Sequence, residues 1–198
     1  MFNVQCSMFN VQCHKVLLHS CCAPCSAAII EWMLKNDIRP TVFYFNPNIY
    51  PREEYERRKA EAIRFVTAQG LDFIDADYDY DAWRREVTGL EEEPERGKRC
   101  LQCFTLRLTA TAKYASEHGF KVFTTTLASS RWKSLEQINE AGRKAASLYP
   151  DTTFWDQNWR KGGLQERRNQ LLKEYQFYNQ QYCGCEFSMR RLDNICKT

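Results

Sequence analysis

The chain has 198 residues, 43% of them hydrophobic and 14% aromatic, and a formal net charge of +3. This length can bury a hydrophobic core without disulfide bonds, and the composition excludes a wholly disordered protein. No stretch approaches the roughly 18 uninterrupted apolar residues of a membrane span, and the N-terminus lacks the apolar core of a signal peptide, so we expect a cytoplasmic protein.

The first 13 residues contain a direct repeat, MFNVQC, which starts at Met1 and again at Met8. A seven-residue copy that begins with Met is typical of a duplicated start or cloning segment and carries no information about the fold. We therefore assign residues 1–13 to this segment and residues 14–198 to a single domain. The repeat contains two cysteines that we expect to be ordinary thiols, Cys6 and Cys13.

Short runs of β-branched and aromatic residues predict strands along the rest of the chain. They lie at 16–20, 41–46, 71–76 and 122–126, with a weaker one at 153–156. Helices are predicted between them at 24–35, 53–69, around Trp83, at 103–118, from Ser134 onward and at 164–178. Pro24 suits a first helical position, Gly70 and Gly119 suit helix ends, and Ser134 with Gln137 forms a capping-box pattern.

Strands that alternate with helices predict an α/β fold with a doubly wound, mostly parallel, Rossmann-like sheet and a helical C-terminal part. Such sheets bind ligands beyond the carboxyl ends of their strands. The residues that follow the first strand are therefore the first place to look for a site.

Three thiols follow the first predicted strand, in the turn His19-Ser20-Cys21-Cys22-Ala23-Pro24-Cys25. Nucleotide-binding proteins of this class have glycines at this turn, so that backbone N–H groups can approach phosphate. This turn contains no glycine, which argues against phosphate binding. A helix N-terminus stabilises negative charge and lowers thiol pKa, so the position suits thiolate ligands.

A second pair of thiols, Cys100 and Cys103, lies at the start of another predicted helix. Two cysteine groups at helix N-termini on one sheet edge can converge on one metal centre, and four thiolates suit either tetrahedral zinc or a [4Fe–4S] cluster. Zinc ligands are normally separated by two or more residues, whereas a cluster with four iron corners accepts adjacent ligands more easily. The adjacent Cys21 and Cys22 therefore favour iron–sulfur over zinc.

The third thiol feature is Cys183-Gly184-Cys185. A disulfide across one intervening residue is strained and easily reduced, and glycine permits the tight turn that such a pair needs. We expect a redox pair here; two further metal ligands or two inert thiols are the alternatives. Cys196 has no assigned role.

The charge is unevenly distributed. Residues 72–95 contain ten acidic and two basic residues, a local charge of −8 that leaves +11 for the rest of the chain. This distribution is compatible with a polyanionic partner, although two solvated faces would give the same pattern.

Several spaced motifs together resemble the cobalamin-independent epoxyqueuosine reductases, which perform the last step of queuosine formation in tRNA. The resemblance covers almost everything from Val16 to about Arg190. It is carried by LLHSCCAPCS (17–26), FNPNIYP (45–51), GLEEEPERGKRCLQCF (89–104), TTLASSRWKS (125–134), NWRKGG (158–163) and YCGC (182–185). The chain departs from the family pattern at Arg131, where proline is expected, and at Asn158, where an acidic residue is expected.

The resemblance implies a single iron–sulfur reductase domain with a fold like that of the adenine nucleotide alpha-hydrolases. It implies that the [4Fe–4S] ligands are Cys21, Cys22, Cys100 and Cys103, and that the redox-active pair is Cys183 and Cys185. An additional iron beside the cluster is compatible with the family. Its candidate ligands are Cys25, Cys183 and Cys185.

The implied reaction converts an epoxide to an alkene and consumes two electrons and two protons. One cluster usually passes one electron at a time, so we expect a second store, either an adjacent iron or the Cys183–Cys185 dithiol. An iron could also bind the epoxide oxygen as a Lewis acid. Four side chains on loops could donate protons, but a structural role is expected for each: His19, Tyr50, Asp77 and Tyr80.

The implied partners are a tRNA with epoxyqueuosine in its anticodon loop and an electron donor that the sequence does not identify, for which a ferredoxin- or flavodoxin-like protein is one candidate. Basic residues interleaved with Trp132, Trp155 and Trp159 suit phosphate contact and stacking on unpaired bases, or else form a helix face that packs through its tryptophans. The basic residues are Arg131, Lys133, Arg160, Lys161, Arg167, Arg168 and Lys173. Our substrate-contact candidates are Arg160, Lys161 and Lys133.

Two other classes of protein remain open from the residues alone. Cys22-Ala-Pro-Cys25 between a strand and a helix is compatible with a thioredoxin-like thiol oxidoreductase. A zinc-stabilised RNA-binding module is the non-enzymatic alternative. Iron, sulfide and zinc content would distinguish the three classes.

Overall fold

The structure is a computed structural model that describes residues 15–189. Within this range one parallel sheet has the strand order β3-β2-β1-β4-β5. The strands are β1 (Val16–His19), β2 (Thr41–Tyr44), β3 (Phe73–Asp75), β4 (Val122–Thr125) and β5 (Thr153–Phe154). The predicted doubly wound α/β fold is confirmed. The repeat at residues 1–13 and Cys196 lie outside the described residues.

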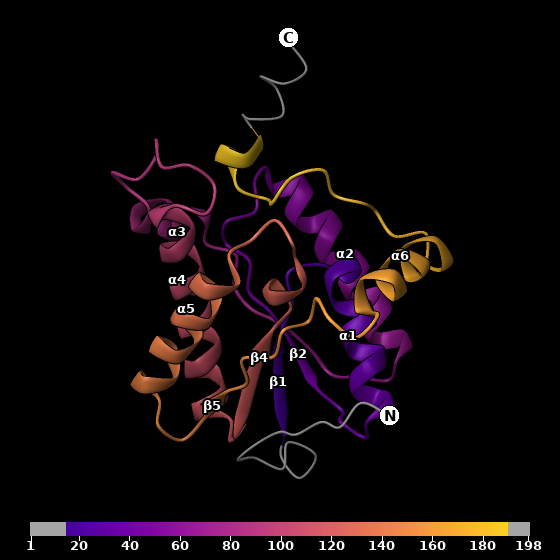
Figure 1. Ribbon diagram of the computed structural model, residues 1–198. Coiled ribbons are helices and arrows are strands. Elements are labelled where there is room, and N and C mark those ends of the chain that lie inside the picture. The colour runs from indigo at the N-terminus through magenta and orange to yellow at the C-terminus, as the bar shows by residue number, and fades with distance from the viewer. Residues whose placement is uncertain (1–14, 190–198) are drawn as a thin grey trace.

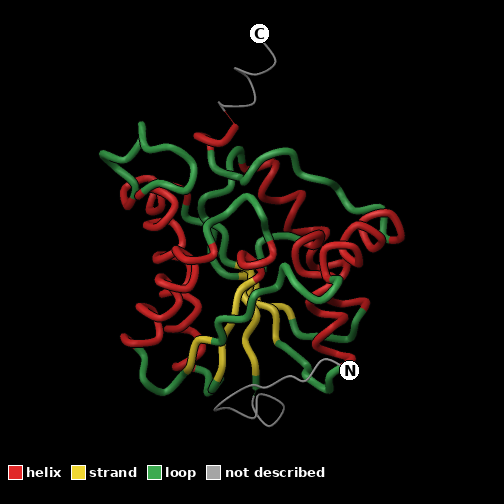
Figure 2. Tube along the Cα trace, viewed as in Figure 1, coloured by secondary structure: helices red, strands yellow, loops and turns green. Residues whose placement is uncertain are grey.

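Helices cover both faces of the sheet (Figure 1). One layer contains α1 (Ala23–Lys35), α2 (Arg52–Ala68) and α6 (Leu164–Glu174), and the other contains α3 (Tyr80–Glu86), α4 (Lys98–Glu117) and α5 (Leu135–Leu148). Figure 2 shows the strands between these two helical layers. No helix in the described part of the chain is long and apolar enough to span a membrane.

Two predicted helix boundaries were wrong. Helix α4 begins at Lys98 rather than at residue 103, because Arg99 bonds the carbonyls of the preceding loop at Leu90 and Glu91 and so holds an extra turn in place. Helix α6 ends at Glu174 rather than at residue 178. Gln176 has a φ of +50°, a backbone conformation that a right-handed helix cannot contain.

The hydrophobic core lies where the central strands meet both helical layers. Leu17, Leu18 and Phe123 are completely buried, and burial of one such side chain contributes roughly 1.5–3 kcal/mol. On α5, a Cβ at Gly142 would lie 2.3 Å from the ring of Phe154 on β5. Glycine at this position therefore allows the edge strand to pack against its helix.

The strand order reverses between β1 and β4, which are hydrogen-bonded neighbours. In open α/β sheets such a switch point leaves a crevice at the carboxyl ends of the strands, because the connections from the two strands run to opposite faces. The turn at residues 20–22 follows β1, and the short 3₁₀ helix Thr126–Ser129 follows β4. The fold therefore places the first thiol turn at its switch point.

Candidate metal centre

Three thiols form a compact group at the switch point. The sulfur atoms of Cys21, Cys22 and Cys25 all lie within 4.8 Å of one another. Cys21 precedes α1 and Cys22 is its N-cap, whereas Cys25 lies in its first turn. Cys22 and Cys25 are buried and Cys21 is partly buried. Their burial argues against a thioredoxin-like role, because an attacking thiol must be accessible to its partner disulfide.

Residues from both central strands hold this turn. The backbone N–H of Cys21 donates to the hydroxyl of Thr126 over 3.1 Å, and that hydroxyl donates to the Cys21 sulfur over 3.4 Å. The hydroxyls of Ser20 and Ser26 are hydrogen-bonded at 2.6 Å. Thr126 follows β4, so the sequence signal that could have identified it is the run Thr124-Thr125-Thr126 at the end of a neighbouring strand.

The three thiols differ in their protonation. A hydrogen bond from the Cys22 thiol holds the pKa of Cys21 well below its usual range. Burial raises the pKa of Cys22 well above its usual range, and the interaction with Cys21 raises that of Cys25 to about 11. The group thus stabilises one thiolate and keeps two thiols protonated. Cation binding would displace those protons, as thiolate ligation requires.

His19 lies at the end of β1, directly below this group. Its Nδ1 is hydrogen-bonded to the Thr125 hydroxyl at 2.7 Å, and its Nε2 to the Phe45 carbonyl at 3.1 Å. Burial, with the Arg107 charge, lowers the pKa of His19 to about 3, so the ring is neutral. Because both ring nitrogens are engaged, His19 joins three strand ends, in agreement with the structural role expected for it.

Cys100 and Cys103 lie in the first two turns of α4. The Cys100 sulfur accepts a hydrogen bond from the Arg96 backbone N–H at 3.3 Å. Burial raises the pKa of Cys100 to about 11, with a further contribution from the charge of Cys183. Cys103 is buried beside Trp83, in the same apolar cluster as Cys185.

The Cys183–Cys185 turn packs against the loop after β2 and against α2. Arg58 donates to the carbonyls of Cys183 and Tyr182 over 3.2 and 3.3 Å, and the Tyr50 backbone N–H donates to the Gly184 carbonyl over 2.8 Å. Gly184 has a φ of +128°, and a Cβ there would lie 3.1 Å from both Arg58 and Ile49. The turn therefore requires glycine at this position.

Both cysteines of this turn are free thiols, and Cys183 is exposed. Burial raises the pKa of Cys185 to about 12, and the charge of Cys183 adds to that rise. The disulfide that the resemblance implies stays a prediction.

Lys133 connects the thiol groups electrostatically. Its side chain is partly buried between the 3₁₀ helix and α5. Burial opposes its charge, but the charges of Cys183, Cys21 and Cys25 outweigh burial and raise the Lys133 pKa. This substrate candidate is therefore partly buried and within electrostatic range of the thiols.

Sequence reasoning missed Gln180, which precedes the Cys183–Cys185 turn. Its amide nitrogen donates to the Cys22 sulfur over 2.9 Å and lies 3.9 Å from the Cys25 sulfur. Its amide oxygen is buried and has no hydrogen-bond partner among residues 15–189. Nothing in the residues around Gln180 marks it, because it comes from a segment without regular structure.

These observations test whether the residues fit a metal centre. Thiolates are soft ligands that select zinc, Cu(I) or iron–sulfur clusters. A buried amide oxygen without a partner is costly unless a bound group faces it. Ligands of a four-iron cluster each bind a different iron, so they are spread more widely than ligands of one ion. The compact group of Cys21, Cys22 and Cys25 therefore fits a metal centre, and the assignment of Cys100 and Cys103 to the same centre stays a prediction.

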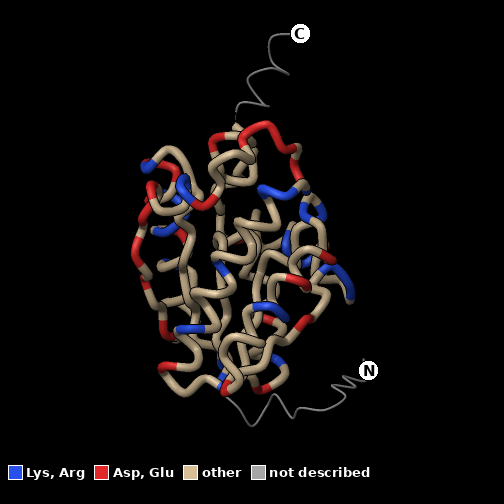
Figure 3. Tube along the Cα trace, turned by 90° about the vertical axis from the view of Figure 1, so that its left-hand side faces the viewer, with Lys and Arg blue, Asp and Glu red and all other residues tan. Residues whose placement is uncertain are grey.

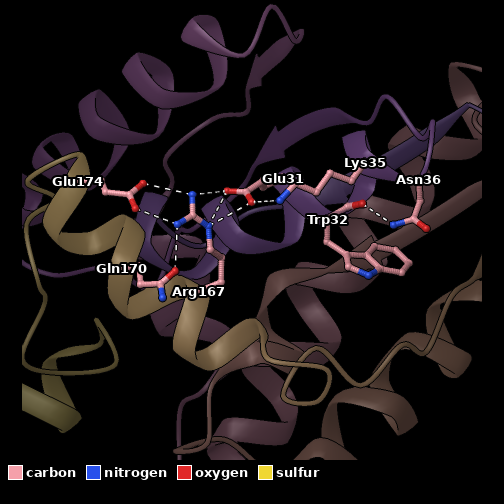
Figure 4. Close-up of polar contacts among 7 residues, drawn as sticks. All are labelled: Glu31, Trp32, Lys35, Asn36, Arg167, Gln170 and Glu174. Carbon is pink, nitrogen blue, oxygen red and sulfur yellow. Dashed lines mark hydrogen bonds and ion pairs between the residues drawn. The ribbon is translucent and has the colours of Figure 1, made fainter. Parts of the chain in front are cut away.

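The predicted basic residues differ in whether carboxylates already neutralise them. Arg167 on α6 is bound by Glu31 through Nε and by Glu174 through a terminal nitrogen, at 2.8–3.1 Å (Figure 4). Arg160 donates to the Lys133 carbonyl over 2.8 Å, and Lys161 is exposed. Arg167 is thus already neutralised by carboxylates, whereas Arg160 and Lys161 form no ion pair with a carboxylate among residues 15–189.

The three tryptophans of this predicted surface differ in their burial. Trp159 is completely buried and packs edge-on against Trp32, with ring centroids 5.4 Å apart, and Trp155 packs against both. For Trp155 and Trp159 the second alternative holds, because both pack against Trp32 of α1. Trp132, in contrast, is 69% exposed.

Acidic and basic segments alternate over the face formed by α3, α4 and α5 (Figure 3). Two acidic residues of the 72–95 region form ion pairs with basic residues of this chain: Asp75 with Lys59, and Glu91 with Arg84. Net charge alone therefore does not define a single binding face.

Comparison with known proteins gives one consistent result. A family profile described as "Epoxyqueuosine reductase QueH" matches residues 16–191. The chain is 51% identical over 176 residues to a protein of that name from Acinetobacter baylyi, covering 89% of this chain and 81% of the relative. It is 50% identical to the one from Haemophilus influenzae, over 89% and 72% of the two chains. A relative from Thermotoga maritima is 33% identical, over 88% and 90%.

Proposed function

The chain belongs to the epoxyqueuosine reductase QueH family, and we propose that it removes the epoxide oxygen of epoxyqueuosine within the anticodon loop of tRNA. The observation that carries this proposal is the compact, buried group of Cys21, Cys22 and Cys25 at the switch point of the sheet. An oxidoreductase with such a group has the ligands for a redox metal at the place where this fold binds its ligands.

The cofactor in this proposal is a [4Fe–4S] cluster. Its ligands would be Cys21, Cys22, Cys100 and Cys103, which leaves Cys25 outside the ligand set. When bound, the cluster supplies single electrons from an external donor. Gln180, which donates to the Cys22 sulfur, would hold that ligand in place, as neighbouring hydrogen bonds do at metal sites.

The Cys183–Cys185 dithiol can supply the electron pair. Oxidation of the two thiols to a disulfide releases two electrons and two protons. The epoxide accepts both, loses its oxygen as water and becomes an alkene, so atoms and electrons balance. Cys183 is exposed, so it can reach a substrate or donor that approaches from solvent.

Lys133 would be a positively charged partner of the reacting groups. Its ammonium interacts with Cys21, Cys25 and Cys183, and it would stabilise the negative charge that develops on the departing oxygen. The RNA would approach along the loop that contains Lys133, with Arg160 and Lys161 beside the phosphates. The reaction would take place in the cytoplasm, with electrons from a ferredoxin- or flavodoxin-like protein.

An anaerobic assay tests this function. The protein is loaded with iron and sulfide, mixed with tRNA that contains epoxyqueuosine and with dithionite, and the nucleosides are separated after digestion. We expect conversion of epoxyqueuosine to queuosine by the loaded protein and none by protein treated with a chelator. Conversion that is equal with and without iron would contradict the proposal.

A further inference from the structure

One tryptophan stands apart from the fold. Trp132 is 69% exposed, more than the other large hydrophobic side chains that are exposed in the described chain: Leu148 at 58%, Tyr50 at 40% and Ile63 at 38%. A single exposed hydrophobic residue is ordinary by itself. What distinguishes Trp132 is how its backbone is held and what surrounds it.

Guanidinium groups fix the backbone around this residue. Arg96 donates to the Trp132 carbonyl over 2.9 Å and to the Arg131 carbonyl over 3.1 Å, and Arg160 donates to the Lys133 carbonyl over 2.8 Å. Three consecutive carbonyls are thus each bound by an arginine. The side chain of Gln137 in turn donates to the Arg96 carbonyl over 2.8 Å. The indole is therefore presented to solvent from a fixed backbone.

Positive charge gathers around the indole. The guanidinium of Arg131 lies 5.1 Å from the centre of the Trp132 ring, a cation–π distance. Burial lowers the Arg160 pKa, and the nearby charge of Arg96 lowers it further. Within residues 15–189, none of the ion pairs with carboxylates involves Arg96, Arg131, Arg160 or Lys133. This charge is therefore available to an anionic ligand.

The position relative to the thiols is equally informative. Lys133, the next residue, interacts with Cys21, Cys25 and Cys183, whereas Trp132 is exposed to solvent. The loop between β4 and α5 rises above the carboxyl ends of the strands (Figure 1). Trp132 therefore lies on a loop above the carboxyl ends of the strands, next in sequence to a lysine on which the thiol charges act.

We propose that Trp132 is a stacking platform for an unpaired base of the RNA substrate, next to the base that enters the thiol site. Arg131 would contact the adjacent backbone phosphate. Aromatic side chains among unpaired cations are the usual means of binding single-stranded RNA, because every base offers a flat face and every nucleotide a negative charge. The proposal rests on the proposed function for the identity of the RNA.

The test compares four variants of the full-length, metal-loaded protein. Trp132→Ala and Trp132→Leu remove the aromatic face, Trp132→Phe keeps one, and Leu148→Ala removes another exposed hydrophobic side chain. Binding is measured by anisotropy of a labelled anticodon stem–loop RNA. We expect Trp132→Ala and Trp132→Leu each to weaken binding between about 5-fold and 150-fold, the range measured for loss of one stacked base. Trp132→Phe should retain most of the affinity, and Leu148→Ala all of it.

Turnover driven by dithionite adds a second readout. For Trp132→Ala we expect KM for the tRNA to rise by a similar factor while kcat changes less than about 3-fold, because a platform contributes to binding rather than to the chemical step. Iron content and thermal unfolding should match those of the parent protein. A merely structural role would change the iron content and the thermal unfolding. It would also give Trp132→Leu and Trp132→Phe the same RNA affinity.

Three results would overturn the proposal: unchanged RNA binding by Trp132→Ala, equal loss by Leu148→Ala, or retained affinity in Trp132→Leu. A defect seen only when an electron-donor protein replaces dithionite would also overturn it and assign Trp132 to that protein. If the parent protein binds RNA through Trp132 but does not convert epoxyqueuosine, the platform stands and the proposed reaction fails. The two ideas can therefore fail separately.

Discussion

The two thiol-bearing turns that are expected to work together are held in different ways. The Cys21–Cys25 turn joins β1 to α1 and is bonded to the ends of the neighbouring strands, with Cys22 and Cys25 buried. The Cys183–Cys185 turn belongs to a segment that follows α6, and its carbonyls are held by Arg58 and Tyr50. The Cys21–Cys25 turn is thus part of the sheet's carboxyl end. The Cys183–Cys185 turn is attached to the rest of the fold by a few polar contacts.

This difference matches the chemistry that each turn is expected to perform. Metal ligands need fixed geometry, which strand ends and a helix N-terminus provide. Thiols that form and break a disulfide must approach one another, a donor and a substrate, so exposure and attachment through side chains suit them better. The comparison predicts that changes in the first turn remove the metal, whereas changes in the second remove turnover and leave the metal.

The largest effect is expected from Cys22→Ser. This change removes a buried sulfur ligand from the compact group, so we expect loss of most of the bound iron and of detectable turnover. Iron and acid-labile sulfide assays with the visible spectrum measure it. The matched control is Cys196→Ser, at a position outside the described residues, which should keep both. Full iron content in Cys22→Ser would mean that this turn is not the metal site.

The second prediction concerns Cys183→Ser and Cys185→Ser. Each should keep its iron and lower kcat by more than about 100-fold, as expected when a reacting group is removed. Metal content and multiple-turnover assays with dithionite measure the two parts separately. Loss of about one metal equivalent in either variant would instead assign the pair to an additional iron, and unchanged activity of the double variant would return both to inert thiols.

The third prediction concerns the attachment of the second turn. Arg58 and Glu54 form a buried ion pair at 2.7 Å with side chains 3% and 9% exposed, so Arg58→Met leaves Glu54 uncompensated. We expect a loss of about 3 kcal/mol in the free energy of unfolding, measured in urea. The double variant Arg58→Met/Glu54→Gln should recover much of that stability. It should still lack the bonds to the turn, and Cys183 should therefore be alkylated faster than in the parent protein.

Recovery of stability without any change in Cys183 alkylation would show that Arg58 serves the fold and not the turn. Cys100, on α4, is the internal reference in this experiment. Its alkylation rate should remain unchanged in the double variant, because Arg58 bonds Glu54, Tyr182 and Cys183 and the Cys100 sulfur is bonded by Arg96 instead.

The smallest effect is expected on the outer surface. Arg160→Gln and Lys161→Gln should each reduce the slope of log affinity for tRNA against log salt concentration by about one unit. Arg167→Gln is the matched control on the same side of the molecule and should leave the slope unchanged, because Glu31 and Glu174 already neutralise Arg167. An equal change of slope in all three variants would refute the distinction between free and paired cations.

The sequence predicted features that follow from local rules. Most elements were predicted from short runs of β-branched and aromatic residues, from the proline at the start of α1 and from the glycine after α2. The alternation of strands and helices predicted the parallel sheet. Thiols directly after a strand were correctly placed at its carboxyl edge. The serine cap of α5 was also correct, since Ser134 accepts from the Gln137 backbone at 3.3 Å.

What the sequence could not predict depends on contacts between distant segments. The capping box was only half formed, because the Gln137 side chain bonds the Arg96 carbonyl instead of returning to Ser134. The Gln180 side chain donates a hydrogen bond to the Cys22 sulfur, although the two residues are 158 positions apart in the sequence. Trp159 and Trp132 are chemically identical, yet one packs against Trp32 and the other is exposed. Local pattern cannot distinguish such cases.

The most direct test of the account is a single turnover that counts thiols. Metal-loaded protein is reduced, freed of excess reductant under anaerobic conditions and mixed with tRNA that contains epoxyqueuosine, and alkylated thiols are mapped by mass spectrometry. The account predicts that two thiols are lost for each queuosine formed, and that these are Cys183 and Cys185. Product formed with all thiols intact, or no product from the metal-loaded protein, would contradict it.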